Sequence, residues 1–119
     1  MERGFAIRSD WDSDAVVIEV TGEIDLATAP ELVSALDGAA GARLVVIDLT
    51  DTTFVDSAAI NSLIRCKRQL AKRGVDFRLV SPPNGIVRKA LEITNVITEL
   101  AVVDSRAEAL TYQKERGGP

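Results

Sequence analysis

The chain has 119 residues, of which 18 are acidic and 14 basic, so its formal net charge is −4. That length favours a single domain over residues 1–119, and the acidic excess argues against nucleic acid as the main partner. With no histidine and one cysteine, Cys66, the sequence excludes a histidine-based catalytic triad, a zinc site of histidines or several cysteines, and a disulfide within one chain.

The first part of the sequence predicts two strands, a helix and a third strand. The strands at 5–9 and 15–21 are close enough to form a hairpin, and the second ends at Gly22. After a polar loop, Thr28-Ala29-Pro30-Glu31 matches a capping box with proline in the first turn, which predicts a helix to about Ala40, ended by Gly41. Residues 43–49 are nearly all apolar, which is typical of a strand covered on both faces.

A long helix is predicted in the middle of the chain, after a loop at 51–56 that carries a short apolar insert. The helix begins at Asp56 or Ser57 and ends at Gly74. Its apolar face is formed by Ala59, Leu63, Cys66 and Leu70. On this face Cys66 is expected to act as a small buried hydrophobe. The basic residues of the second half suit the negative end of the helix dipole and are expected to be solvated.

The last third of the chain continues the alternation. It predicts a strand at 75–81, a short amphipathic helix at 84–93, a strand at 100–103 and a final helix from Asp104 or Ser105 to about Lys114, with a disordered tail at 116–119. The order is therefore β-β-α-β-α-β-α-β-α. Strands that alternate with helices predict a compact α/β domain with a largely parallel or mixed sheet of about four to five strands.

The segment at 54–60 has two polar residues at the junction between a predicted strand and a predicted helix. An acid, Asp56, and a hydroxyl, Ser57, stand where an apolar strand and its loop lead into the longest helix. Ligands of α/β sheets gather beyond the carboxyl ends of strands, where helix N-termini present free N–H groups. The same residues fit an ordinary N-cap, because Ser and Asp at that position stabilise a helix by about 1 kcal/mol. The residues alone leave both interpretations open.

The other candidate functional sites have less support from the sequence. Glu23 and Asp25 follow Gly22 in a loop expected at the same sheet edge, and they fit solvated loop acids better than a paired-carboxylate hydrolase. The sequence has no GxGxxG and no GxxxxGK[ST] motif, so it predicts no dinucleotide or P-loop site and no cofactor.

The sequence also lacks an apolar run of about 18 residues and the core of a signal peptide, so we expect a cytoplasmic protein without a membrane span.

Three segments together carry a resemblance to a known family. They are VTGEIDLATAP at 20–30, VVIDL at 45–49 followed by FVDS at 54–57, and SPP at 81–83 followed by IVRKALE at 86–92. In this order and spacing they resemble the STAS family, specifically the bacterial anti-sigma factor antagonists. The resemblance covers nearly the whole chain. It implies a mixed sheet with helices packed mainly on one side, and protein binding in place of catalysis.

The resemblance also implies a mechanism of partner switching. An unphosphorylated antagonist binds an anti-sigma factor with a GHKL-type kinase fold and thereby frees a sigma factor. The same anti-sigma factor phosphorylates the antagonist with ATP and magnesium, and a PP2C-type phosphatase reverses the modification. Carried over, Ser57 is the phosphoacceptor. The partner-binding residues are expected to be Glu23, Asp25, Thr28, Asp56, Ser57, Ala58 and Asn61.

A phosphate on Ser57 would act through its charge. It adds about −1.5 to −2 beside Asp56 at a helix N-terminus that tolerates an anion, so we expect the switch to act between molecules and not within the domain. Ala59 and Asn61 stand where the family turn has glycines, so their side chains add bulk where a partner approaches.

Two alternative functions remain: a non-switching interaction or scaffold domain of a stress-signalling complex, and a weak nucleotide-binding or small-molecule-binding domain.

Overall fold

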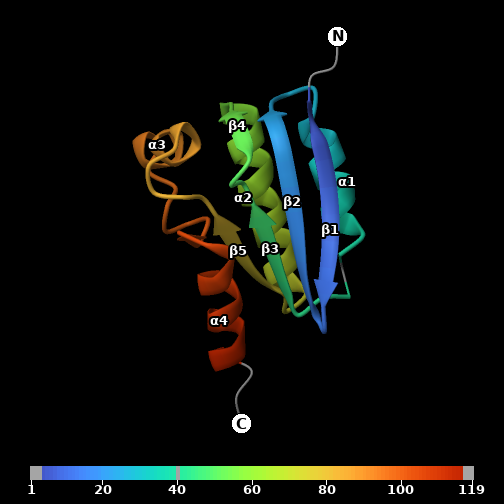
Figure 1. Cartoon of the computed structure of the whole chain (residues 1–119). Coiled ribbons are helices and arrows are strands. Elements are labelled where there is room, and N and C mark those ends of the chain that lie inside the picture. The colour runs from blue at the N-terminus through green and yellow to red at the C-terminus, as the bar shows by residue number, and fades with distance from the viewer. Residues whose placement is uncertain (1–3, 40, 117–119) are drawn as a thin grey trace.

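The computed structural model describes residues 4–39 and 41–116, with side chains up to residue 111, and shows a six-stranded mixed sheet with four helices (Figure 1). The strands are β1 (Ala6–Asp12), β2 (Ala15–Ile24), β3 (Leu44–Asp48), β4 (Thr52–Val55), β5 (Asp76–Val80) and β6 (Val102–Val103). The helices are α1 (Ala29–Asp37), α2 (Ser57–Lys72), α3 (Ile86–Ile93) and α4 (Arg106–Arg116). The predicted α/β class is confirmed, with one strand more than expected.

The sheet is mixed because only its first pair is antiparallel. Its strand order is β1-β2-β3-β5-β6, with β4 paired to β2 outside this path. The predicted hairpin of the first two strands is confirmed, with Asp12 opposite Ala15. The remaining pairs are parallel. The long β2 changes partner along its length: its first half pairs with β3, and its end, from Gly22, pairs with β4, with a register shift between Gly22 and Glu23.

Strand β4 is the element that the sequence analysis placed in a loop. Its residues Thr52, Thr53, Phe54 and Val55 are β-branched or aromatic, as strands favour, but four residues are too few for the alternation to be recognised. The pairing with β2 decides the conformation, and the buried Thr52 hydroxyl strengthens it by donating to the Val20 carbonyl at 2.8 Å. This strand carries the chain to the start of α2 alongside the end of β2.

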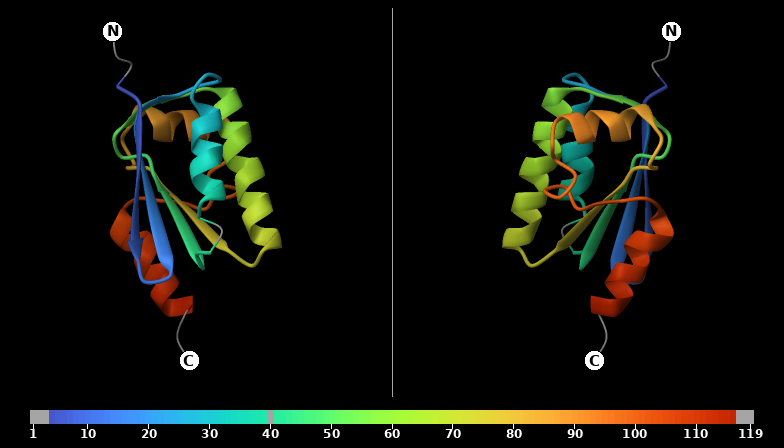
Figure 2. Two further views of the ribbon diagram at one scale, coloured as in Figure 1. Left: turned by 90° about the vertical axis from the view of Figure 1, so that its right-hand side faces the viewer. Right: turned by 90° about the vertical axis from the view of Figure 1, so that its left-hand side faces the viewer.

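The helices lie unequally on the two faces of the sheet (Figure 2). The larger core lies under α1, α2 and α3, where fully buried side chains include Ile18, Leu32, Leu63 and Leu91. A smaller cluster under α4 contains Val17, Leu44, Val46, Val80 and Ala109. Packing mainly on one side, as the family resemblance implied, is therefore confirmed. All five residues of β3 are buried, which explains its nearly continuous apolar run.

Several predicted boundaries differ from the observed ones. Helix α1 ends at Asp37, with Gly38 as C-cap, earlier than the expected Ala40, which lies outside the described residues. Strand β1 extends to Asp12 because its whole length pairs with β2. Strand β6 is shorter than expected because only two of its residues pair with β5. Helix α4 continues to Arg116, and the remainder of the expected tail, 117–119, lies outside the described residues.

Candidate functional site

The candidate site lies where the ends of β2 and β4 lead into α1 and α2. Because these two strands are parallel neighbours, their carboxyl ends meet at one edge of the sheet. The Asp56 N–H donates to the Ile24 carbonyl at 3.2 Å, so the two strand ends are directly bonded. Glu23 and Asp25 therefore lie beside the Asp56-Ser57 junction, at the sheet edge that the sequence analysis expected. The prediction that Glu23 lies in a loop is wrong, because β2 continues to Ile24 and Glu23 pairs with Phe54 of β4.

The Asp56 carboxylate joins the two loops. Its Oδ1 accepts a hydrogen bond from the Ala59 N–H at 2.8 Å, which caps α2. Its Oδ2 accepts one from the Leu26 N–H at 3.2 Å, across 30 positions of sequence. Asp56 is thus the N-cap, while Ser57 is the first residue of the helix and is exposed. The capping interpretation holds for Asp56 and leaves the Ser57 hydroxyl free of that role.

The loop between β2 and α1 is held by its own side chains. The Asp25 Oδ1 accepts hydrogen bonds from the N–H groups of Ala27 and Thr28, each at 3.0 Å. The Thr28 hydroxyl donates to the Glu23 carbonyl at 2.9 Å and accepts from the Asp25 N–H at 2.9 Å. Thr28 therefore makes no capping bond to α1, and the predicted capping box is wrong because the loop takes its hydroxyl.

Gly22 lies inside β2, where the strand begins to pair with β4. Its φ is +95°, a conformation that favours glycine, and it lies at the register shift of β2. A Cβ at this position would lie 2.9 Å from the Gly4 carbonyl oxygen and 3.0 Å from the Phe5 Cα. The glycine of the family-like segment is thus required by a close approach of the N-terminal backbone.

The residues expected to bind a partner differ in exposure. Glu23, Ser57 and Asn61 are exposed, Asp25, Asp56 and Ala58 are half-buried, and Thr28 is buried. They come from the end of β2, the loop before α1, the junction between β4 and α2, and the first turns of α2. The expectation that Ala59 adds bulk to this surface is wrong, because its methyl group points into the core and is fully buried. Of the two residues that replace family glycines, only Asn61 has an exposed side chain.

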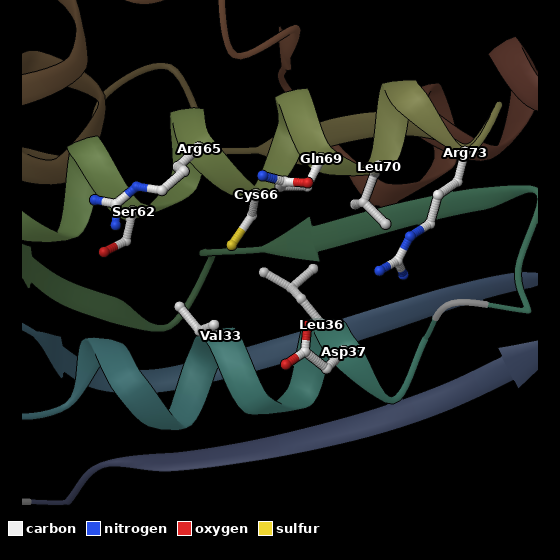
Figure 3. Close-up of a pocket in the computed structure, with 9 residues that line it drawn as sticks. All are labelled: Val33, Leu36, Asp37, Ser62, Arg65, Cys66, Gln69, Leu70 and Arg73. Atoms are coloured by element: carbon white, nitrogen blue, oxygen red, sulfur yellow. The ribbon is translucent and has the colours of Figure 1, made fainter.

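A groove between α1 and α2 begins beside this site, and the sequence analysis missed it. A hollow of about 530 Å³ is lined by Leu26, Pro30, Ala58 and Asn61, among others. A second hollow of about 190 Å³ lies further along the helices (Figure 3). Cys66, expected to be buried, is half-buried and lines the second hollow, where burial raises the pKa of its thiol. The amphipathic pattern of α2 gave no sign of the groove, since it depends on the spacing of two helices.

On the opposite face, an ion-pair cluster fastens α4 to the sheet. The Arg106 guanidinium lies 2.9 Å from the buried Asp48 carboxylate and 2.6 Å from that of Glu19. Burial opposes ionisation of Asp48, but hydrogen bonds from Thr50 and Arg106 outweigh it and lower its pKa. Hydrogen bonding to Asp48 in turn raises the pKa of Arg106. Because each charge has a close partner, this cluster is a structural attachment.

Two classes of site find no support in the described part of the chain. No group of three or more His, Cys, Asp or Glu side chains there is arranged to hold a metal ion. Within the same residues, no helix has the length and apolar character needed to cross a bilayer.

Comparison with protein families identifies the domain. The model of the STAS domain matches residues 7–109. The chain belongs to the STAS domain family. The match includes both loops of the candidate site and all of α2, so the recognition made from the three segments is confirmed. Among curated proteins, none matches the sequence significantly.

Solved structures share the fold of this STAS domain. An anti-sigma factor antagonist from Mycobacterium paratuberculosis superposes with a TM-score of 0.82 at 24% identity, covering 94% of this chain and 96% of that one. The antagonist SpoIIAA in its unphosphorylated form gives a TM-score of 0.74 at 19% identity, covering 96% and 99%. The phosphorylated form of SpoIIAA, described as a Bacillus cell fate determinant, gives 0.68 at 18% identity, covering 90% and 98%.

The fold also occurs in much larger proteins. The murine anion transporter Slc26a9 matches 91% of this chain with a TM-score of 0.75 at 15% identity, over 19% of its own length. A STAS fold by itself is therefore compatible with more than one kind of protein.

Proposed function

We propose that this STAS domain is an anti-sigma factor antagonist that binds a kinase-type anti-sigma factor while Ser57 is unphosphorylated, and so releases a sigma factor. The observation that carries the proposal is the exposed Ser57 hydroxyl at the first position of α2, next to a cap supplied by Asp56. A phosphoacceptor must be reachable by another protein's active site, and a serine that caps its own helix would have to break that bond first.

The geometry also supports a switch that leaves the domain folded. Phosphorylation forms a bond between the Ser57 Oγ and the γ-phosphorus of ATP, releases ADP and passes the hydroxyl proton to a base of the kinase. The new group stands at a helix N-terminus, where the dipole and the free N–H groups of the first turn stabilise an anion. Ala59 and Leu63 of the same helix are fully buried, whereas Ser57 is exposed, so the phosphate is added outside the core.

The same phosphate opposes binding of the partner. It adds about −1.5 to −2 units of charge to a surface that already carries Glu23, Asp25 and Asp56. A partner face that accepts the neutral serine would then have to desolvate a dianion next to three carboxylates. Thr28 contributes by holding the loop, whereas Ala58 and Asn61 extend the contact surface along α2. Dephosphorylation by a PP2C-type phosphatase would restore binding.

On this proposal the domain is a substrate and binding partner, with no catalysis, cofactor or nucleic-acid contact of its own. Its place of action is the bacterial cytoplasm, where sigma factors and ATP are found.

Transfer of phosphate tests the proposal. The chain is incubated with ATP, magnesium and the candidate anti-sigma factor, and the modified residue is mapped by mass spectrometry. We expect phosphate on Ser57, no transfer to Ser57→Ala, and normal transfer to the control Ser34→Ala, which removes an exposed serine from α1. Binding without transfer would support a non-switching interaction domain, and turnover of a small substrate by the isolated chain would contradict both.

A further inference from the structure

The two hollows between α1 and α2 form one groove. They share three lining residues, Val33, Ser62 and Arg65. The hollow nearer the candidate site includes Ala58 and Asn61, and the other reaches Arg73 at the end of α2. The groove therefore runs along most of α2 and begins within the surface assigned above to partner binding. Ser57 itself does not line it.

The floor of the groove is apolar. Figure 3 shows Val33 and Leu36 of α1 pointing toward Cys66 and Leu70 of α2. At its near end, Leu26 is 75% exposed and also lines the groove, although a large aliphatic side chain gains by leaving water. Because Leu26 adjoins this floor, it is part of a contiguous apolar surface and not an isolated exposed residue, and contiguous apolar patches mark interaction sites.

The rim of the groove is positively charged. Arg65 and Arg73 line it, and across residues 4–39 and 41–111 neither has a carboxylate within 4.0 Å. By contrast, Arg68 of the same helix lies outside the groove and pairs with Glu99 at 2.8 Å. The lining contains one acid, Asp37. An occupant with carboxylates beside its apolar side chains would complement this rim.

We propose that the groove binds an amphipathic helix of the protein partner, with two apolar side chains in the hollows and Asp or Glu facing Arg65 and Arg73. The hollows are centred about six residues apart along α2, or about 9 Å, which is close to the distance between positions i and i+7 of a helix. Helix-in-groove binding uses anchors at this spacing. The inference rests on the proposed function for the identity of the partner, and on the groove for its chemistry.

A designed peptide tests the groove directly. The probe is a helical peptide of about 18 residues with leucines at i and i+7 and glutamates beside them, titrated into the ¹⁵N-labelled chain and followed by NMR. We expect amide shifts confined to α1 and α2, including Val33 and Leu70. The same peptide with lysines in place of the glutamates should not bind. The Ser57→Asp variant should bind the acidic peptide as the unmodified chain does, because Ser57 lies outside the groove.

Charge reversal at neighbouring positions supplies the matched control. Arg73→Glu should weaken binding of the acidic peptide about tenfold, because it replaces attraction by repulsion at the rim. Lys72→Glu changes the net charge equally, one residue away and outside the lining, and should change the affinity by less than about twofold. Equal weakening by both variants, absence of groove shifts, or groove shifts with dodecanoate in place of the peptide would each overturn the proposal.

The partner itself separates the two proposals. If an anti-sigma factor phosphorylates Ser57 but its affinity is the same for the Arg65→Glu and Arg73→Glu variants as for the unmodified chain, the groove proposal fails alone. If the acidic peptide binds in the groove while no anti-sigma factor binds or modifies the chain, the proposed function fails and the groove remains a helix-binding site.

Discussion

The Asp56 carboxylate is the best place to test the architecture of the site, because its two oxygens serve different parts of the chain. Oδ1 caps α2 through the Ala59 N–H, and Oδ2 holds the loop before α1 through the Leu26 N–H. Asp56→Ala removes both bonds. Asp56→Asn keeps one acceptor oxygen, which can still cap the helix, but its NH₂ group cannot accept the second bond.

The expected losses follow from these bonds. Loss of the cap costs about 1 kcal/mol, and loss of the exposed loop bond about 0.5 kcal/mol, so Asp56→Ala should lower the free energy of unfolding by about 1.5 kcal/mol. Asp56→Asn should lower it by about 0.5 to 1 kcal/mol, since the charge that favours the helix dipole is also lost. Urea unfolding followed by circular dichroism measures both values. Asp51→Ala, which removes an exposed acid from the loop before β4, is the control and should cost less than about 0.5 kcal/mol.

Amide hydrogen exchange resolves the two bonds individually. The Leu26 N–H should lose protection in both variants, whereas the Ala59 N–H should lose it in Asp56→Ala and keep it in Asp56→Asn. If Leu26 stays protected in both variants, or if Ala59 is affected equally, the carboxylate does not bridge the loops and the assignment of Asp56 as the link is refuted.

Three further predictions test other parts of the structure. Gly22→Ala should destabilise the fold by at least about 2 kcal/mol in urea unfolding, because its Cβ would meet the Gly4 carbonyl, whereas Gly41→Ala, with open space around it, should stay within about 0.5 kcal/mol of the unmodified chain. Hydrogen bonds from Thr50 and then Arg106 lower the pKa of Asp48, so its contribution to stability is present above about pH 4 and is lost as the pH falls through the folded-state value. The destabilisation by Asp48→Asn should therefore be smaller at about pH 3 than at about pH 7, and equal destabilisation would contradict stabilisation of the Asp48 carboxylate by Thr50 and Arg106. Ser57→Glu should weaken the complex with the anti-sigma factor about tenfold in isothermal titration calorimetry, and an unchanged affinity would count against the switch.

Strand β4 and helix α2 differ in how strongly their residues predict them. Helix α2 was predicted almost to the residue because four apolar side chains repeat on one face over 16 residues. Strand β4 has four residues, and its conformation comes from pairing with a segment about 30 positions earlier. The sequence contains the β-branched residues but not the partner that makes them a strand.

The hydrogen bonds of the Thr28 hydroxyl are a second feature that the sequence did not predict. The sequence Thr28-Ala29-Pro30-Glu31 has the residue types of a capping box, and a helix does begin there. The hydroxyl instead bonds to the Glu23 carbonyl and the Asp25 N–H, because the preceding loop folds back over it. Local residue types predicted the element correctly. Competition between nearby N–H donors decided which of them the Thr28 hydroxyl accepts from.

The sequence alone determined the α/β class, the STAS family and the position of Ser57 at a strand-to-helix junction, because these depend on local periodicity and on motifs in order. The tertiary structure decided which of Asp56 and Ser57 caps α2, since that choice depends on the extended backbone at Asp56 and on its bond to the Leu26 N–H. It also decided that α1 and α2 leave a groove between them. The bond from the Leu26 N–H to Asp56 and the groove both arise from contacts between segments that are distant in the sequence. Such contacts produce no periodic pattern of residues from which they could be predicted.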